Sequence, residues 1–182
     1  LFSDDNFSTS ATSNVGGWKD KSGKGKHATQ ATPSKKPTYT ISDALLKNKA
    51  TISSSSATGK IGLELPSITL QEIFIVAYYD DGIDSTFDGS AALLSGPQSY
   101  GKYRIMGSSS NPDWLTTSDF NDAGSFKNGS DSSSNSALPM PASLLRFTSS
   151  SPRTEARNIL YCIDNNNKGW IGAIGEIIGL ST

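Results

Sequence analysis

The sequence Gly17-Trp-Lys-Asp-Lys-Ser-Gly-Lys-Gly-Lys-His-Ala-Thr-Gln30 carries the strongest structural signal in this chain. Trp18 is a large apolar anchor placed directly before a polar, glycine-rich run, so a strand that buries one ring should end in a tight turn. Asp20 and Ser22 have short side chains that accept hydrogen bonds from backbone N–H groups two residues further on. The glycines at positions 23 and 25 can take positive φ because they lack a Cβ atom. These residues predict a strand-turn-strand unit.

Other segments predict further strands. Residues 71–79 are mostly β-branched or aromatic and predict a central strand buried on both faces, or nearly so. The tripeptide Lys127-Asn128-Gly129 predicts a hairpin turn, whereas residues 111–128 are expected to form a long polar loop. Prolines 139 and 141 argue against a central strand there, and no segment has helical periodicity, so helix content should be small. Additional strands are expected at residues 1–5, 38–41, 91–94, 100–106, 144–148, 158–163 and 170–180.

The composition sets limits on the class of protein. The 182 residues fit a single domain, 1–182, because a β-sandwich of this length can bury a sizeable core without metals or disulfides. The only cysteine, Cys162, lies in an apolar run, which favours a buried thiol over a reactive one. The net charge of −1 argues against a general nucleic-acid binder. No apolar run reaches the roughly 18 residues of a membrane helix, so membrane insertion is not expected. The predicted fold class is all-β, with one antiparallel β-sandwich.

The charges are distributed unevenly along the chain. Residues 18–60 contain nine lysines and two aspartates, whereas residues 61–182 contain seven basic and thirteen acidic residues. This polarity could let subunits dock head to tail; the alternative is an ordinary solvated surface. The chain starts at Leu1 without a methionine, which indicates a piece processed or excised from a longer protein. A first strand cut short at residues 1–5 would leave an unpaired sheet edge, to which a neighbouring subunit could add a strand.

Two motifs at opposite ends of the chain resemble one family. Both are similar to the opening and closing segments of concanavalin A-like, laminin-G-like jelly rolls found in bacterial surface proteins and phage structural proteins. The resemblance implies a jelly-roll β-sandwich with Trp18 and Trp170 in or beside the core, first and last strands that are near neighbours, and an extracellular, cell-surface or virion location. This fold carries lectins, hydrolases and structural modules alike. The opening motif comprises Trp18, Asp20, Ser22, Gly23, Gly25, Ala28, Pro37 and Tyr39, and the closing motif comprises Gly169, Trp170, Ile171, Gly172, Ile174, Glu176, Ile177 and Ile178.

The sequence shows no recognisable catalytic machinery. A retaining glycosidase needs two carboxylates about 5 Å apart, and the glucanases of the resembled superfamily place their acids close together on one strand. Here the glutamates at 64, 72, 155 and 176 are isolated from one another. His27 is the only histidine and is far from Cys162 in sequence, so a Cys-His pair is not expected. Gly23-x-Gly25 superficially fits a dinucleotide fingerprint but lacks a following helix. We therefore expect no enzymatic activity.

A calcium site is one hypothesis for the acidic loop after the central strand. Four aspartates, Asp80, Asp81, Asp84 and Asp88, fall within nine residues that also include Gly82, and Gly89 follows directly. Hard carboxylate oxygens on a loop are the ligands that Ca²⁺ prefers. The alternative is an ordinary solvated acidic turn, and both readings stay open.

A carbohydrate-binding cluster is the second hypothesis, because sugars stack on exposed aromatic rings and are fixed by polar side chains beside them. The alternative is that Trp114 and its neighbours hold a long loop against the sandwich. The expected function is a non-catalytic carbohydrate-binding or adhesion module of a cell-surface or phage structural protein, with a glycan or surface polysaccharide as partner. The alternative is a structural subunit of an extracellular filament or virion that self-associates through its sheet edges. The candidate glycan contacts are Tyr100, Tyr103, Arg104, Asn111 and Trp114.

Overall fold

The computed structural model describes residues 2–3, 12–55, 61–80, 90–96, 105–108, 114–115, 123–131, 140–161 and 169–181. In these ranges the chain forms fourteen β-strands and two short 3₁₀ turns, η1 (Pro33–Lys35) and η2 (Ala44–Leu46). Every strand pairing within them is antiparallel. The predictions of an all-β antiparallel protein and of low helix content are confirmed.

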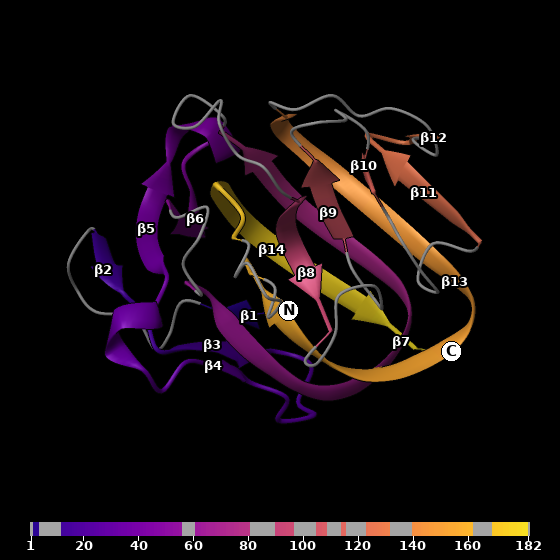
Figure 1. Ribbon diagram of the computed structural model, residues 1–182, viewed down its shortest axis with the longest axis horizontal. Helices are drawn as coiled ribbons and strands as arrows, with labels where there is room; N and C mark the ends of the chain where they lie inside the picture. The colour runs from indigo at the N-terminus through magenta and orange to yellow at the C-terminus, as the bar shows by residue number, and fades with distance from the viewer. Residues whose placement is uncertain are drawn as a thin grey trace.

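Two long strands organise the sheet. β7 (Leu63–Tyr79) and β13 (Met140–Ile159) pair with each other over most of their length, and Figure 1 shows them as long, curved ribbons running side by side. β14 (Gly172–Leu180) pairs with the other side of β7. The sheet is open, and its strands follow the order β10-β9-β8-β13-β7-β14-β6-β5-β2. The remaining strands of this path are β10 (Trp114–Leu115), β9 (Ile105–Ser108), β8 (Ser90–Ser95), β6 (Lys49–Ser54), β5 (Thr38–Asp43) and β2 (Thr12–Asn14).

Shorter strands branch from this path. β3 (Gly17–Asp20) pairs with both β1 (Phe2–Ser3) and β4 (Ala28–Thr29), and β4 joins the sheet through Glu64 of β7. β11 (Gly124–Lys127) pairs with β12 (Ser130–Asp131) and with β13. Between β11 and β12, Asn128 and Gly129 have φ values of 52° and 84°. Positive φ at both central residues is typical of a two-residue hairpin turn, so the predicted Asn-Gly hairpin is confirmed.

The core lies on one face of the central strands. Ile73, Ile75 and Ala77 of β7 are buried, and they alternate with partly exposed residues on the opposite face. The expectation that residues 71–79 are buried on both faces, or nearly so, is therefore met fully on one face and only in part on the other, and the strand is central as predicted. Trp18 and Trp170 lie in the core as expected, at 5% and 0% exposure.

Trp170 is held by both apolar and polar contacts. Its ring meets that of Tyr79 edge to face at a centroid distance of 4.8 Å. Its indole N–H donates to the backbone oxygen of Tyr78 at 2.9 Å, so the buried polar atom is satisfied. Gly172 lies so close to the same strand that a Cβ atom there would be 2.2 Å from the Tyr78 oxygen. The closing motif therefore packs tightly against β7.

Four sequence-based predictions about the strands differ from the structure. Residues 144–148 and 158–163 were expected as two strands, but 140–159 form one strand because a register shift between Thr148 and Arg153 lets the chain continue across residues 149–152. Pro141 lies near the start of this strand, at a second shift between Met140 and Ser143, where a residue without an N–H is tolerated. The expected loop 111–128 contains β10 and β11. β1 pairs with β3, whereas β14 lies between β7 and β6, so the first and last strands are not neighbours.

Candidate functional site

The turn between β3 and β4 is organised by the side chain of Asp20. Its carboxylate accepts hydrogen bonds from the backbone N–H and hydroxyl of Ser22 at 2.7 and 2.9 Å and from the backbone N–H of Lys26 at 3.0 Å. The backbone N–H of Asp20 donates to Nδ1 of His27 at 3.0 Å, which makes this histidine a residue that closes the turn. Gly23 and Gly25 have φ values of 80° and 68°. The predicted strand-turn-strand unit is confirmed, and so are its two predicted acceptors, since Asp20 and Ser22 each accept a hydrogen bond from the backbone N–H two residues further on.

These hydrogen bonds also fix the charge of Asp20. Partial burial alone would raise the pKa of its carboxyl group, but the hydrogen bonds from Ser22 and Lys26 stabilise the carboxylate and leave the pKa below its usual value. Asp20 is therefore ionised at neutral pH, and its oxygens are used within the turn.

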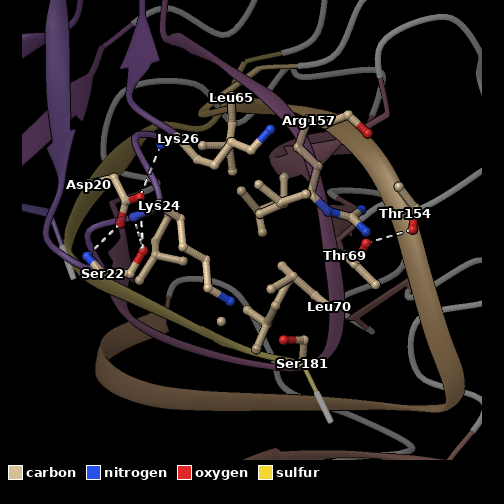
Figure 2. Close-up of a pocket in the computed structure, with 16 residues that line it drawn as sticks. Asp20, Ser22, Lys24, Lys26, Leu65, Thr69, Leu70, Thr154, Arg157 and Ser181 are labelled. Atoms are coloured by element: carbon tan, nitrogen blue, oxygen red, sulfur yellow. Dashed lines mark hydrogen bonds between the residues drawn. The ribbon is translucent and has the colours of Figure 1, made fainter.

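The turn covers one side of a cavity of about 540 Å³, a size in the range of small-molecule sites. Figure 2 shows the side chains of Lys24 and Lys26 extending from the turn on one side, with Arg157 pointing in from the other. The wall of the cavity is aliphatic and includes Leu65, Ile68, Leu70, Ile73, Leu94 and Ile177. Its hydroxyl groups come from Ser22, Ser67, Thr69, Thr154 and Ser181.

Irregular pairing between β7 and β13 shapes this cavity. Only three successive pairs, Arg153↔Leu70, Thr154↔Thr69 and Glu155↔Ile68, separate two register shifts. Such bulges bend a strand and increase its twist, and Figure 1 shows both strands curving strongly along this part of their length. The bend turns the paired segment away from the flat sheet and leaves space beneath the Asp20 turn.

Gly179 of β14 contributes to the same space. A Cβ atom on Gly179 would lie 2.5 Å from Cδ2 of Leu70, closer than non-bonded carbons approach. The absence of a side chain on Gly179 therefore sets the position of Leu70 in the cavity wall.

The cavity is electropositive. Arg157 is only 2% exposed, so its guanidinium charge lies within the protein, where charges are screened less than at the surface. Lys24 and Lys26 add two exposed cations, and Asp20 is the one acidic residue among the described lining residues. The hydroxyls of Thr69 and Thr154 lie 2.7 Å apart and form a hydrogen bond at the rim. Cations combined with hydroxyl groups are suited to binding an anionic ligand.

A second cavity of about 420 Å³ lies beside the first and shares Leu65 and Arg157 with it. It also includes His27 and Glu64. The carboxylate of Glu64 accepts a hydrogen bond from the hydroxyl of Tyr161 at 3.1 Å. Burial and then the negative charge of Glu64 raise the pKa of Tyr161 well above its usual value. Tyr161 therefore stays protonated and donates to Glu64.

Two of the described glutamates, Glu64 and Glu72, have separate partners. Glu64 bonds to Tyr161, whereas Glu72 forms an ion pair with Arg146 across β7 and β13. The guanidinium of Arg146 also lies over the rings of Phe126 and Phe74, at 5.0 and 5.8 Å from their centroids. Each of these two acids thus has a different partner in a different part of the sheet. The absence of enzymatic activity remains a prediction.

The predicted calcium loop lies mostly outside the described residues. Asp80 is exposed, and its backbone N–H donates to the oxygen of Ile171 at 2.9 Å, while Asp81, Asp84 and Asp88 lie outside the described ranges. Among the residues that are described, there is no group of three or more His, Cys, Asp or Glu side chains suited to a metal ion.

The predicted glycan cluster is also described only in part. Trp114 lies in β10, at one end of the sheet, where its backbone pairs with Gly107 of β9. Tyr100, Tyr103, Arg104 and Asn111 lie outside the described residues, as does Cys162.

The cavity itself was not predicted from the sequence. Its lysines contributed to the basic character of residues 18–60, but Lys24 and Lys26 were not distinguished from their neighbours. The only local signal for Arg157 is a cation two residues before the apolar run that begins at Ile159. The elements that meet at the cavity are far apart in sequence.

Comparison of the chain with family models, curated proteins and solved structures gives no match in any of the three. Over the described ranges, the structure contains no helix whose length and apolar character would let it cross a membrane.

Proposed function

We propose that this chain is a non-catalytic recognition module of the laminin-G-like jelly-roll β-sandwich type, which binds an acidic glycan at a cell or virion surface. The observation that carries the proposal is the cavity beneath the Asp20 turn, with Lys24, Lys26 and Arg157 among its lining residues. The antiparallel sheet and the buried tryptophans of both terminal motifs support the fold part of the proposal.

The chemistry of the cavity favours an acidic sugar over a neutral one. Cationic side chains form charge-assisted hydrogen bonds with carboxylate or sulfate groups, and the hydroxyls at the rim can donate to or accept from sugar hydroxyls. Within the described part of the chain, the cavity presents no aromatic ring on which a neutral sugar would stack. Charge is therefore the main source of selectivity in this proposal.

A glycan array that pairs acidic and neutral sugars tests this function. We expect acidic glycans to bind, and the double variant K24Q/K26Q to bind them more weakly. The matched control is K19Q/K21Q, which removes two charges from the same segment at exposed residues that do not line the cavity. An equal loss of glycan binding in both variants, or equal binding of neutral and acidic glycans by the parent chain, would count against the cavity as the binding site.

The same array examines the calcium and aromatic hypotheses. If Asp80, Asp81, Asp84 and Asp88 hold Ca²⁺ needed for recognition, EDTA should abolish binding. If Trp114 contacts the sugar, Trp114→Ala should weaken binding while leaving the unfolding midpoint close to that of the parent chain. Binding that survives both treatments but is lost in K24Q/K26Q would assign recognition to the cavity alone.

The second candidate is a structural subunit that self-associates through sheet edges. It is favoured by the open sheet, whose path ends in β10 and β2. Ile41 of β5, the strand that pairs with β2, is 55% exposed, and Leu45 of η2, which follows β5 in the chain, is 59% exposed. Exposed apolar groups near a sheet end favour association. Solution scattering over a wide concentration range tests this candidate. A monomer at every concentration, combined with glycan binding, would reject it.

A further inference from the structure

We propose that the cavity beneath the Asp20 turn accepts an amphiphilic anion, a ligand with an aliphatic chain and one anionic head group. The inference rests on the proposed function because it concerns the same cavity, and it specifies the class of ligand more closely. An acylated acidic sugar or a free alkyl carboxylate has this shared chemistry.

The wall of the cavity is suited to an aliphatic chain. Ile73, Leu94 and Ile177 are at most 5% exposed and come from three different strands, β7, β8 and β14. Leu65 and Leu70 of β7 add to the same apolar lining. Because the described lining is aliphatic and not aromatic, it offers an alkyl chain apolar surface that a purely polar sugar cannot use.

The polar groups are placed to hold the head of such a ligand. Lys24 and Lys26 are exposed on the turn, while Arg157 points into the cavity from β13 on the opposite side. An anionic head between the turn and Arg157 would lie near three cations, with the chain directed toward the aliphatic wall. Asp20 is the one described acid in the lining, and one carboxylate beside three cations leaves the lining with a net positive charge.

The volume is consistent with this class of ligand. A cavity of about 540 Å³ is within the range of small-molecule sites, which extends from about 300 to 1,000 Å³. A single inorganic anion would leave most of this apolar space unfilled. The combined apolar and cationic lining therefore favours a ligand with both parts.

Isothermal titration calorimetry with hexanoate, octanoate and decanoate, each below its micellar concentration, tests the inference. We expect the affinity to rise about fourfold for each added CH₂, the factor that corresponds to about 0.8 kcal/mol per buried methylene. Octan-1-ol and glucuronate are the two comparison ligands, since each has only one part of the proposed chemistry. Octanoate should bind more tightly than either.

Two variants locate the head group. K24Q/K26Q should weaken octanoate binding by roughly fivefold, as expected for the loss of two partly exposed charge contacts, whereas K19Q/K21Q should change it little. Ser181→Glu adds a carboxylate at an exposed lining residue and should also weaken octanoate binding. These substitutions are at exposed residues, and the unfolding midpoint of each variant reports whether the fold is intact.

The outcomes separate this inference from the proposed function. Binding of glucuronate without any gain from alkyl chains would overturn the amphiphile and leave the acidic-glycan function standing. Octanoate binding that both K24Q/K26Q and Ser181→Glu leave unchanged would overturn the assignment to this cavity. Failure of both octanoate and acidic glycans to bind would overturn both proposals.

Discussion

The contribution of Asp20 to stability follows directly from its three hydrogen bonds. Replacing Asp20 by alanine removes the acceptor for two backbone N–H groups and for the hydroxyl of Ser22. A net hydrogen bond contributes about 0.5–1.5 kcal/mol, and groups that remain accessible to water lie at the lower end of that range. We therefore expect Asp20→Ala to reduce the free energy of unfolding by about 2 kcal/mol and Asp20→Asn by about half as much.

The same carboxylate predicts a dependence on pH. The pKa of Asp20 is lower in the folded chain than in the unfolded chain, so the unfolded state binds more protons at acidic pH. The stabilisation by Asp20 should be complete above the ordinary aspartate pKa of 3.8 that applies to the unfolded chain, and it should be lost as the pH falls through the lower pKa of the folded chain. The difference in the free energy of unfolding between the parent chain and Asp20→Asn should therefore become smaller at acidic pH.

Urea unfolding followed by tryptophan fluorescence measures both effects, because Trp18 is buried two residues before Asp20. A shift in midpoint at constant slope reports a change in stability. The control is Ser22→Ala, which removes one of the three hydrogen bonds to Asp20 and should cost less than Asp20→Ala. Unfolding of Asp20→Ala at the parent midpoint near pH 7 would refute the stabilising role of these hydrogen bonds. A stability difference between the parent chain and Asp20→Asn that is equally large at pH 7 and in strong acid would refute the role of the carboxylate charge.

Three further predictions concern residues of β7 and of the closing motif, and the same unfolding assay measures them. Gly172→Ala should lower stability by about 3 kcal/mol or more, because its Cβ would clash with the Tyr78 oxygen at a φ of 147°; Gly17→Ala, with its nearest neighbour atom at 3.6 Å, should cost much less. Trp170→Phe should cost about 2 kcal/mol through the lost hydrogen bond and the smaller ring. Burial and the nearby charge of Asp43 raise the pKa of Tyr78 to about 12, so the parent chain should lose stability between about pH 10 and 12. Tyr78→Phe should reduce that loss, by about 1 kcal/mol after allowance for its partial exposure.

The parts of the fold that the sequence predicted are those whose cause is local. The turn at Asp20 depends on side chains and glycines within eight residues of one another, and the Asn128-Gly129 hairpin depends on two adjacent residues with positive φ. Both were recognisable because short polar side chains and residues tolerant of positive φ have few other uses at such spacings. The apolar run at 71–79 likewise predicted a central strand from composition alone.

The length and curvature of β13 could not be predicted in the same way. Residues 149–152, Ser-Ser-Ser-Pro, have the composition of a loop. They remain in one strand because β7 pairs with β13 on both sides of the irregular segment, at Thr148↔Glu72 and at Arg153↔Leu70. Tertiary pairing therefore overrides local preference. Residues 71–79 of β7 are fully buried on one face only, for a related reason: the composition of a strand does not show whether another layer covers it.

The candidate cavity depends entirely on such long-range pairing. Lys24 and Arg157 are 133 positions apart in number, and the sequence gives no indication that they share a cavity. The charge asymmetry of residues 18–60 was visible, but its two interpretations, docking between subunits and a solvated surface, concern the outside of the protein. Only the bend of β7 and β13 beneath the turn brings a subset of these cations to an apolar space.

The structure divides four lysines of the opening segment into two pairs by their position relative to the cavity, a division that the sequence does not show. Lys24 and Lys26 line the cavity, whereas Lys19 and Lys21 do not and are exposed to solvent. If the basic segment serves ligand binding, replacing Lys24 and Lys26 should weaken the binding of the ligand, and replacing Lys19 and Lys21 should leave it nearly unchanged. If it serves docking to an acidic face of another subunit, all four lysines should contribute through their combined charge, and the effects should scale with the number removed. Because both pairs lie within eight residues and carry the same charge, a difference between K24Q/K26Q and K19Q/K21Q can arise only from their positions relative to the cavity.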